Sequence, residues 1–348
     1  MGRSSKDDIR HIDASILELL NRRASLASIG TNASPADLSL EDADIKRISE
    51  ANMGPLTETQ VITLFREIMS QGRELNAPST VSYLGPEASF THQAAFRRFG
   101  SGAVLHPCQS ISSVFKDVEA GRSSFGVVPV ENSTEGAVTY TLDLLVNSDV
   151  QICAEMNLRI NHCLMSSCSE EDITVVYSHP QVFGQCREWI SERLPEAELI
   201  EVKSTAEAAR RAVEEGHSAI ASRMASALYG LPILHDGIED NPNNSTRFLV
   251  LNLASSPPTG DDKTSICFAL KDRTGALYDA LQPFKEMDIN LTMIQSRPSK
   301  VRNWDYVFFT DMQGHSDDRP IASALSQLGD VCVFLRVLGS YPRNESSQ

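Results

Sequence analysis

The sequence has no excess of basic residues and no long apolar run, and each absence excludes a class of protein. Its 348 residues include 31 Lys and Arg against 46 Asp and Glu, a formal net charge of −15. Such an acidic chain repels polyanions, so we expect no nonspecific binding of nucleic acid. No segment is long and apolar enough to span a bilayer, and the polar start lacks a signal-peptide core. We therefore expect a cytoplasmic protein without a membrane partner.

The sequence also lacks closely spaced cysteine pairs. Its seven cysteines, at positions 108, 153, 163, 168, 186, 267 and 332, form no Cys-x-x-Cys motif. An odd, scattered set is typical of free thiols in a reducing compartment rather than of a disulfide framework. We therefore expect no disulfides, no metal centre and no cofactor.

The first 77 residues carry a helical pattern. Apolar residues recur there at spacings of three and four, as at Ile9, Ile12 and Ile16. Continuing this stripe places Arg23 on the face that should be core, where an unpaired charge is costly. Either the guanidinium reaches solvent from the edge of a helix, or it belongs to an anion site in a helical bundle.

From residue 79 to residue 254 short apolar runs alternate with helical segments, which indicates α/β organisation. Length and element order fit the two-lobed architecture of periplasmic solute-binding proteins, with a ligand between the lobes at strand ends. The expected strands are 81–84, 103–105, 126–130, 173–177, 199–202, 219–221 and 248–253, and the expected helices are 91–99, 111–119, 181–193 and 205–215.

A turn-rich, charged segment at 255–262 reads as a linker. Beyond it, residues 262–343 alternate as strand, helix, strand, strand, helix and strand. This βαββαβ order predicts a ferredoxin-like module. The whole chain is therefore expected to be multidomain, with a helical arm, a two-lobed α/β domain and this third module.

Four polar patches coincide with predicted strand ends in the middle domain, at 85–91, 129–136, 178–181 and 244–248. Helix N-termini that converge on one cleft attract anions through free N–H groups and the helix dipole. Each patch also has a purely structural explanation. Ser89, Ser133 and Thr134 are suitable helix N-caps, and His179 precedes a proline in a turn.

The order of these patches resembles a known family. The segments 129–136 (Pro-Val-Glu-Asn-Ser-Thr-Glu-Gly), 178–181 (Ser-His-Pro-Gln) and 244–248 (Asn-Ser-Thr-Arg-Phe) resemble the signatures of prephenate dehydratase. The segments 275–277, 295–298 and 338–342 are similar to those of its phenylalanine-sensing ACT domain. The N-terminal helices resemble an AroQ-type chorismate mutase. The resemblance thus implies domains at 1–77, 79–254 and 262–343, as in the bifunctional family that serves phenylalanine biosynthesis.

The resemblance implies a lyase that converts prephenate to phenylpyruvate by losing water and carbon dioxide. Thr246 matches the family threonine needed for dehydration, and we expect its hydroxyl to donate a hydrogen bond to the departing oxygen. Arg247 either pairs with a substrate carboxylate or braces the lobe, and Phe248 would form an apolar wall. The expected substrate contacts are Ser89, Asn132, Ser133, Thr134, His179, Gln181, Asn244, Arg247 and Phe248.

Each of the three regions departs from the family pattern. Ala88 stands where glycine is usual, so we expect helical or extended backbone there and altered substrate choice or rate rather than lost activity. In the ACT domain Gln295 replaces a glutamate, which favours weaker feedback by phenylalanine. In the helical domain Leu40 replaces an arginine. The expected effector-site residues are Gly275, Ala276, Leu277, Gln295, Ser296, Arg297 and Pro298.

The mutase resemblance lacks further cations. Lys6 falls where the family has an arginine, no lysine lies between Lys6 and Lys46, and no arginine lies between Arg23 and Arg47, so two cations of the family site are missing. Each lost charge-assisted contact removes about 1.5–3 kcal/mol of transition-state binding. We therefore expect a dimerisation arm with weak or lost mutase activity, in a homodimer or homotetramer. The vestigial site would comprise Lys6, Arg23, Asp37, Glu41, Gly72 and Asn76.

Several alternatives remain open at the level of sequence. The chain could be fully bifunctional, could prefer arogenate, or could only decarboxylate prephenate, although retention of Thr246 argues against the last. A non-enzymatic alternative is a two-lobed solute-binding sensor that responds to amino acids. Asp272, Asn290 and Asp311 are interpreted as ordinary polar strand ends without a role.

Overall fold

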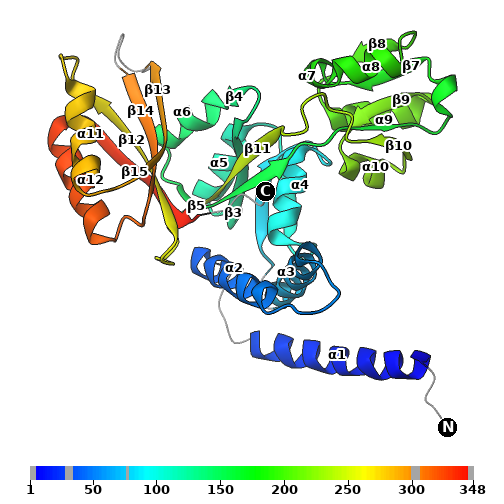
Figure 1. The fold of residues 1–348 in the computed structure, drawn as a ribbon, viewed down its shortest axis with the longest axis horizontal. Helices are drawn as coiled ribbons and strands as arrows, with labels where there is room; N and C mark the ends of the chain where they lie inside the picture. The colour runs from blue at the N-terminus through cyan, green and yellow to red at the C-terminus, as the bar shows by residue number, and fades with distance from the viewer. Residues whose placement is uncertain (1–4, 28–33, 76–77, 299–305, 344–348) are drawn as a thin grey trace.

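The computed structural model describes residues 5–27, 34–75, 78–298 and 306–343. Along the chain it contains three helices, a two-lobed α/β region and a C-terminal α/β module (Figure 1). This order agrees with the sequence patterns. Among the described residues, no helix is both long and apolar enough to cross a membrane.

The first three helices begin with favourable local signals. Ser34 and Thr57 each cap a helix, and each closes a capping box with the residue three positions later. One ion pair and one hydrogen bond join these helices to the α/β region. Arg98 pairs with Asp42 at 2.6 Å, and Arg73 donates to the carbonyl of Phe99 at 2.7 Å. The helices are α1 (Ser5–Ala27), α2 (Pro35–Glu50) and α3 (Glu58–Glu74).

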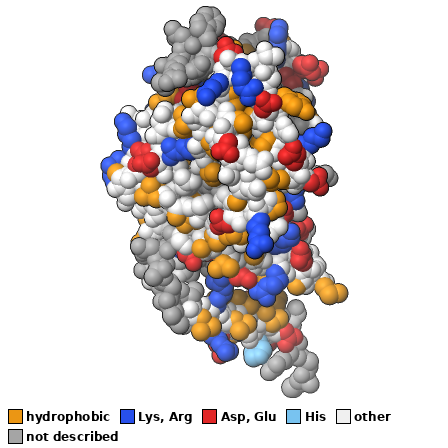
Figure 2. Space-filling view, turned by 90° about the vertical axis from the view of Figure 1, so that its left-hand side faces the viewer, with side chains coloured by type: hydrophobic (Ala, Val, Ile, Leu, Met, Phe, Trp, Pro, Cys, Tyr) orange, Lys and Arg blue, Asp and Glu red, His pale blue; other side chains and the backbone are white. Residues whose placement is uncertain are grey.

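The apolar stripe of α1 is not core within one chain, unlike the sequence expectation. Its residues are between 49% and 66% exposed, although α1 lies against α3. In Figure 2, hydrophobic side chains gather at the lower end, where α1 lies, while acidic and basic side chains are interspersed above. The exposed residues of this stripe are Ile9, Ile12, Ile16, Leu19 and Leu26.

The first lobe is a sheet in the order β2-β1-β3-β11-β5, with β4 attached to β3. α4 covers one face, while α5 and α6 cover the other. Pro107 is tolerated because its strand is at the sheet edge. The elements are β1 (Thr80–Leu84), α4 (Phe90–Phe99), β2 (Val104–Cys108), α5 (Ile111–Glu119), β3 (Phe125–Asn132), β4 (Gly136–Ala137), α6 (Thr139–Asn147), β5 (Gln151–Arg159) and β11 (Ser245–Asn252).

The second lobe is inserted between β5 and β11, and its sheet runs β10-β6-β9-β7-β8. The two connecting segments touch each other, since the Ile160 N–H donates to the carbonyl of Asn244 at 2.9 Å. The elements are β6 (Cys163–Met165), η1 (Glu170–Asp172), β7 (Val175–Ser178), α7 (Pro180–Gln185), α8 (Arg187–Arg193), β8 (Glu198–Glu201), α9 (Thr205–Glu215), β9 (Ser218–Ala221), α10 (Arg223–Tyr229) and β10 (Ile233–Asp236).

The C-terminal module has the predicted βαββαβ order and an antiparallel sheet, β13-β14-β12-β15. Helices α11 and α12 pack on one face, and the other face contacts the first lobe (Figure 1). The elements are β12 (Asp262–Leu270), α11 (Ala276–Glu286), β13 (Leu291–Pro298), β14 (Tyr306–Gln313), α12 (Arg319–Val331) and β15 (Cys332–Pro342).

One hydrophobic core joins the first lobe to the C-terminal module. Phe309, Leu338 and Tyr341 of the module are buried in the same cluster as Ile152 and Leu249 of the lobe. Gly339 permits the closest approach, because a Cβ there would lie 2.1 Å from the Ile152 carbonyl oxygen. The module is therefore docked through packed backbone rather than through side chains alone.

Some predicted boundaries were wrong. The helix expected over 181–193 is divided at Cys186 into α7 and α8, and α6, α10, β5, β6 and β10 were not predicted. Cys186 leaves the helical region, with φ −119 and ψ 21. The missed elements are mostly short, and short apolar runs do not distinguish strand from helix.

Replacing Gly339 with alanine tests this docking. We expect a loss of about 1–3 kcal/mol in unfolding free energy, the usual cost of overpacking, measured by denaturant titration. Gly329→Ala is the matched control, since its Cβ would meet its nearest neighbour, Leu335, at an ordinary 3.8 Å. Equal stability of the two variants would contradict the close approach.

Candidate active site

Strand β11 lies between β3 and β5 and places adjacent side chains on opposite faces of the sheet. Thr246 is opposite Asn132 on β3 and Leu158 on β5. Phe248 shares the α4 side of the sheet with other core residues, whereas Leu249 faces α5 and α6. Thr246 and Arg247 therefore point to different parts of the molecule.

Asn132 organises the polar mouth of β11. Its side-chain Nδ2 donates to Thr246 Oγ1 and to Asn244 Oδ1, both at 2.9 Å. Its Oδ1 accepts the backbone N–H groups of Thr134 at 3.0 Å and Glu135 at 3.1 Å. Because the Thr246 oxygen accepts from an amide, its own hydrogen stays available for another acceptor.

The same network crosses to the second lobe. Asn244, only 1% exposed, donates from Nδ2 to Gln185 Oε1 at 3.2 Å. His162 Nε2 lies 2.8 Å from the same Gln185 oxygen. Burial lowers the pKa of His162, although the bond to Gln185 acts in the opposite direction. A neutral ring that donates through Nε2 fits this geometry.

Gln185 was not predicted as a site residue. It lies one helical turn after the predicted Gln181, which is exposed at the start of α7. Periodicity places both on one side of the helix, so the sequence contained a weak signal for Gln185. Only the fold shows that Gln185 reaches Asn244.

The remaining polar residues of the 129–136 patch hold the loop in place. Ser133 Oγ accepts the Ser245 N–H at 2.9 Å and donates to the Asn243 carbonyl at 3.3 Å. Thr134 is exposed, and its hydroxyl lies 3.4 Å from Asn244 Oδ1. Ser133 therefore joins the 129–136 patch to the start of β11 by hydrogen bonds, and Thr134 lies at the rim of the network.

Ser89 and His179 both act as helix N-caps. Ser89 Oγ accepts the N–H of His92 at 3.2 Å and donates to the Leu84 carbonyl at 3.2 Å. His179 Nδ1 accepts the N–H of Gln181 at 3.3 Å. Phe248 is 1% exposed and belongs to the core beside α4. The local structural roles considered for Ser89 and His179 are thus present.

The expectation for Ala88 was wrong. Its φ is 62°, in the left-handed region, which costs an L-residue roughly 1–2 kcal/mol. The surroundings hold this conformation. The Ala88 N–H donates to His92 Nδ1 at 2.9 Å, and its carbonyl accepts from Ser222 Oγ at 2.9 Å. The Cβ is fully buried in the core of the second lobe, so Ala88 links the two lobes.

Arg247 faces away from Thr246 and is engaged by protein groups. It pairs with Glu155 at 2.7 Å and with Asp311 of the C-terminal module at 2.7 Å. Its remaining nitrogen donates to Tyr341 Oη at 3.0 Å. Of the two alternatives for Arg247, this geometry is the bracing one. Asp311, to which the sequence assigned no role, is one of its partners.

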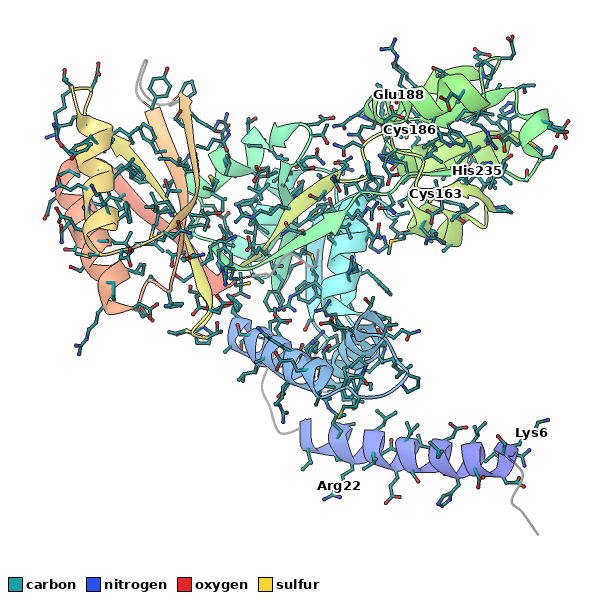
Figure 3. All side chains as sticks on the ribbon, viewed as in Figure 1. Lys6, Arg22, Cys163, Cys186, Glu188 and His235 are labelled. Carbon is teal, nitrogen blue, oxygen red and sulfur yellow. The ribbon has the colours of Figure 1, made fainter. Side chains whose placement is uncertain are left out.

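The residues expected for a vestigial mutase site do not converge within one chain. Lys6 and Arg23 are at opposite ends of α1, about 25 Å apart by helix rise, and Figure 3 shows Lys6 and Arg22 in these positions. Glu41 pairs with Arg73, and Asp37 closes the capping box of α2. Gly72 is buried in α3, and Asn76 lies outside the described residues.

The residues expected at the effector site lie on two elements of the C-terminal module. Gly275, with φ 79°, caps α11 ahead of Ala276 and Leu277. Arg297 pairs with Asp143 of α6 at 3.0 Å. The segment 295–298 forms the end of β13, an edge strand of the sheet. Through the Arg297–Asp143 pair, this segment contacts the first lobe directly.

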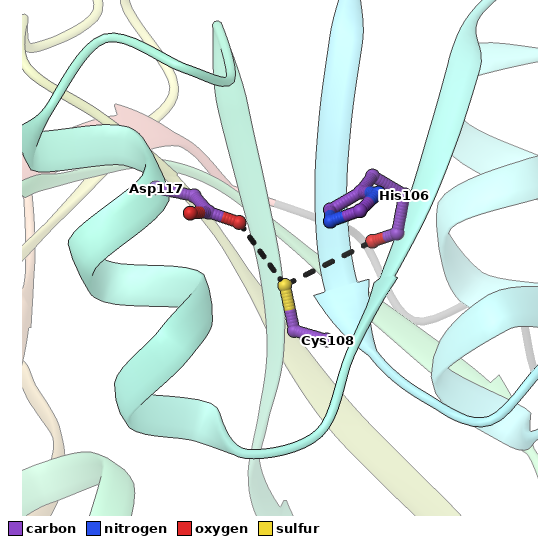
Figure 4. Close-up of side chains that lie close together, drawn as sticks. All are labelled: His106, Cys108 and Asp117. Carbon is purple, nitrogen blue, oxygen red and sulfur yellow. Dashed lines mark hydrogen bonds between the residues drawn. The ribbon is translucent and has the colours of Figure 1, made fainter.

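In the part of the chain that the structure describes, one side-chain cluster has metal-ligand composition: His106, Cys108 and Asp117 (Figure 4). Asp117 already binds Arg122 at 2.8 Å and Ser82 at 3.0 Å, and Cys108 Sγ donates to it at 3.2 Å. Burial raises the pKa of Cys108 to about 11. Because a cation would have to displace a guanidinium and a proton, we assign this cluster a structural role.

Comparisons with known proteins agree with this geometry. Residues 81–256 match the prephenate dehydratase family, and residues 265–330 match the ACT domain family. A bifunctional chorismate mutase/prephenate dehydratase of Pseudomonas aeruginosa is 44% identical, with 96% of each chain covered.

Solved structures show the same fold. A prephenate dehydratase from Arthrobacter aurescens in complex with L-Phe has a TM-score of 0.70 at 34% identity, covering 76% of this chain and 90% of that one. A quorum-quenching acylase, GqqA, has a TM-score of 0.71 at 28% identity, covering 77% of this chain and 100% of that one. By sequence and fold together, the chain belongs to the bifunctional chorismate mutase/prephenate dehydratase family.

Proposed function

We propose that this protein is a prephenate dehydratase whose reaction takes place at the mouth of β11. The observation that carries the proposal is the Thr246 hydroxyl, held by Asn132 Nδ2 at 2.9 Å where the two lobes meet. Membership of the family supplies the substrate, prephenate, and the product, phenylpyruvate.

The reaction needs positioning more than a strong acid. The bond from the ring to its carboxylate breaks and releases carbon dioxide, the electron pair moves into the ring, and the ring hydroxyl leaves. That oxygen takes up one proton and departs as water. Thr246 donates a hydrogen bond to the leaving oxygen while the proton comes from solvent, because a threonine hydroxyl is a poor acid near neutral pH.

We assign the site to residues from both lobes. Asn132 and Asn244 hold the Thr246 hydroxyl and the loop, and Gln185 extends the network from the second lobe. Thr134, Ser89 and Gln181 remain proposed substrate contacts at the rim. Closure of the lobes onto a dianion would exclude bulk water apart from the molecule that supplies the proton, and this exclusion strengthens each hydrogen bond.

Replacing Thr246 with valine tests this assignment, because it removes the hydroxyl and keeps the shape. We expect phenylpyruvate formation from prephenate to fall about 100-fold or more in kcat, as when one preorganised donor is lost. Thr246→Ser should retain most of the activity.

Thr310→Val is the matched control for that experiment. Among the described residues, the Thr310 hydroxyl has no hydrogen-bond partner, and the residue is fully buried in the C-terminal module. This variant should therefore turn over prephenate like the wild type. Undiminished activity of Thr246→Val, or no phenylpyruvate from the wild type, would refute the proposed function.

We further propose that the helical region at 1–77 is a mutase-like domain with weak or no chorismate mutase activity. Its expected residues are dispersed within one chain, and Glu41 is neutralised by Arg73. The exposed stripe of α1 would be covered by a second copy of the chain in a homodimer or homotetramer.

Supplying chorismate alone to the purified protein tests the mutase proposal. We expect turnover at least about 100-fold below that on prephenate, because two cationic contacts are missing. Measuring the initial rate of chorismate loss gives the answer. Rates similar to those with prephenate would show instead that both activities are retained.

A further inference from the structure

We propose that Arg247 is the positioning residue through which the ACT module controls Thr246. The proposal rests on the proposed function, with phenylalanine as the effector. It concerns an interdomain ion cluster, defined here as Arg247, Glu155, Lys263 and Asp311 together with the hydroxyls of Ser265 and Tyr341.

The ion cluster is closed and balanced in charge. Glu155 accepts from Arg247 at 2.7 Å and from Lys263 at 2.6 Å, and Asp311 forms an ion pair with Arg247, Oδ2 to Nη1, at 2.7 Å. Two cations thus face two anions. The carboxylates are 2% and 3% exposed, so neither has water as an alternative partner.

Two hydroxyls complete the ring on the side of the ACT module. Tyr341 Oη lies 2.6 Å from Ser265 Oγ, which donates to Asp311 Oδ1 at 2.6 Å. Burial, together with nearby Asp311, raises the pKa of Tyr341 well above its ordinary value. The phenol therefore keeps its proton, accepts from Arg247 and donates to Ser265.

The ion cluster joins two strands of the first lobe to three strands of the ACT module. Arg247 and Glu155 come from β11 and β5 of the first lobe, whereas the other members come from β12, β14 and β15 of the ACT module. Removing one partner of a buried ion pair leaves an uncompensated charge. Movement of the module must therefore either displace Arg247 or take Asp311 and Tyr341 away from it, and Arg247 is joined by one peptide bond to Thr246.

A short path connects the expected effector segment to this ion cluster. Asp311 on β14 is the register partner of Met293 on β13, two residues before Gln295. The Thr292 hydroxyl also donates to the Asp311 carbonyl, at 3.4 Å. A ligand that shifts β13 thus acts on the strand that carries Asp311, and Asp311 acts on Arg247.

The surroundings leave room for a second arrangement. A small cavity adjoins the ion cluster and is lined by Arg247, Asp311 and Ser265 together with apolar residues such as Leu249 and Leu338. The backbone of β11 also has an irregular register with β3 between Arg247 and Phe248. A small shift of the guanidinium toward this cavity therefore meets free space rather than packed atoms.

The test compares phenylalanine binding with phenylalanine inhibition in Tyr341→Phe and Asp311→Asn. Binding is measured by calorimetry, and inhibition by prephenate turnover over a phenylalanine titration. We expect binding within about threefold of wild type, and a phenylalanine concentration for half-inhibition at least tenfold higher. A residue with a merely structural role would change both quantities together.

Arg336→Gln is the matched control. Arg336 is another guanidinium between the two domains, but it donates to the carbonyl of Val146 in α6 at 3.3 Å and to the carbonyl of Ser148 just after that helix. Its inhibition curve should match the wild type. An equal loss of inhibition in this variant would overturn the assignment to Arg247 and its partners.

Four further results would test the coupling between the ACT module and Thr246. Unchanged inhibition in both cluster variants, or loss of binding in step with loss of inhibition, would overturn the proposal. If Asp311→Asn fails to fold, Tyr341→Phe decides alone. Wild-type protein that converts prephenate but ignores phenylalanine would overturn the coupling only, whereas wild-type protein inactive on prephenate would remove the proposed function on which it rests.

Discussion

The alternation of side chains along β11 is the constraint on which the rest of the structure depends. Thr246 lies where the two lobes join, and Asn132 holds its hydroxyl there, whereas Arg247 faces the ACT module, where Glu155 and Asp311 hold its charge. Because β11 lies between β3 and β5, neither side chain can move far unless the sheet moves. One strand therefore carries the proposed catalytic hydroxyl on one face and the domain contact on the other.

Much of this arrangement could be predicted from the sequence, for identifiable reasons. The βαββαβ order follows from long, strongly periodic segments, and the polar patches mark strand ends that meet at Asn132, Asn244 and Thr246. What could not be predicted depends on distant partners. Arg247 reaches Asp311, 64 positions further along the chain, and Gln185 reaches Asn244 only because the lobes meet.

Ala88 and the helical arm show how local rules yield to packing. Alanine avoids positive φ in isolation, yet bonds to His92 and Ser222 and burial of its Cβ hold Ala88 at 62°. Conversely, the apolar stripe of α1 satisfies every rule for a core helix but remains exposed within one chain. Glu41 was expected in the vestigial mutase site. It instead forms an ion pair with Arg73, which joins α2 to α3.

The central claim, that β11 carries effector information to the catalytic hydroxyl, is tested most directly by hydrogen exchange of its backbone amides. Exchange of residues 245–252 should be followed with and without saturating phenylalanine, alongside the ACT strands. The account predicts that phenylalanine changes protection in β11 as well as in β13 and β14. A change confined to the ACT module, with β11 unaffected, would contradict it.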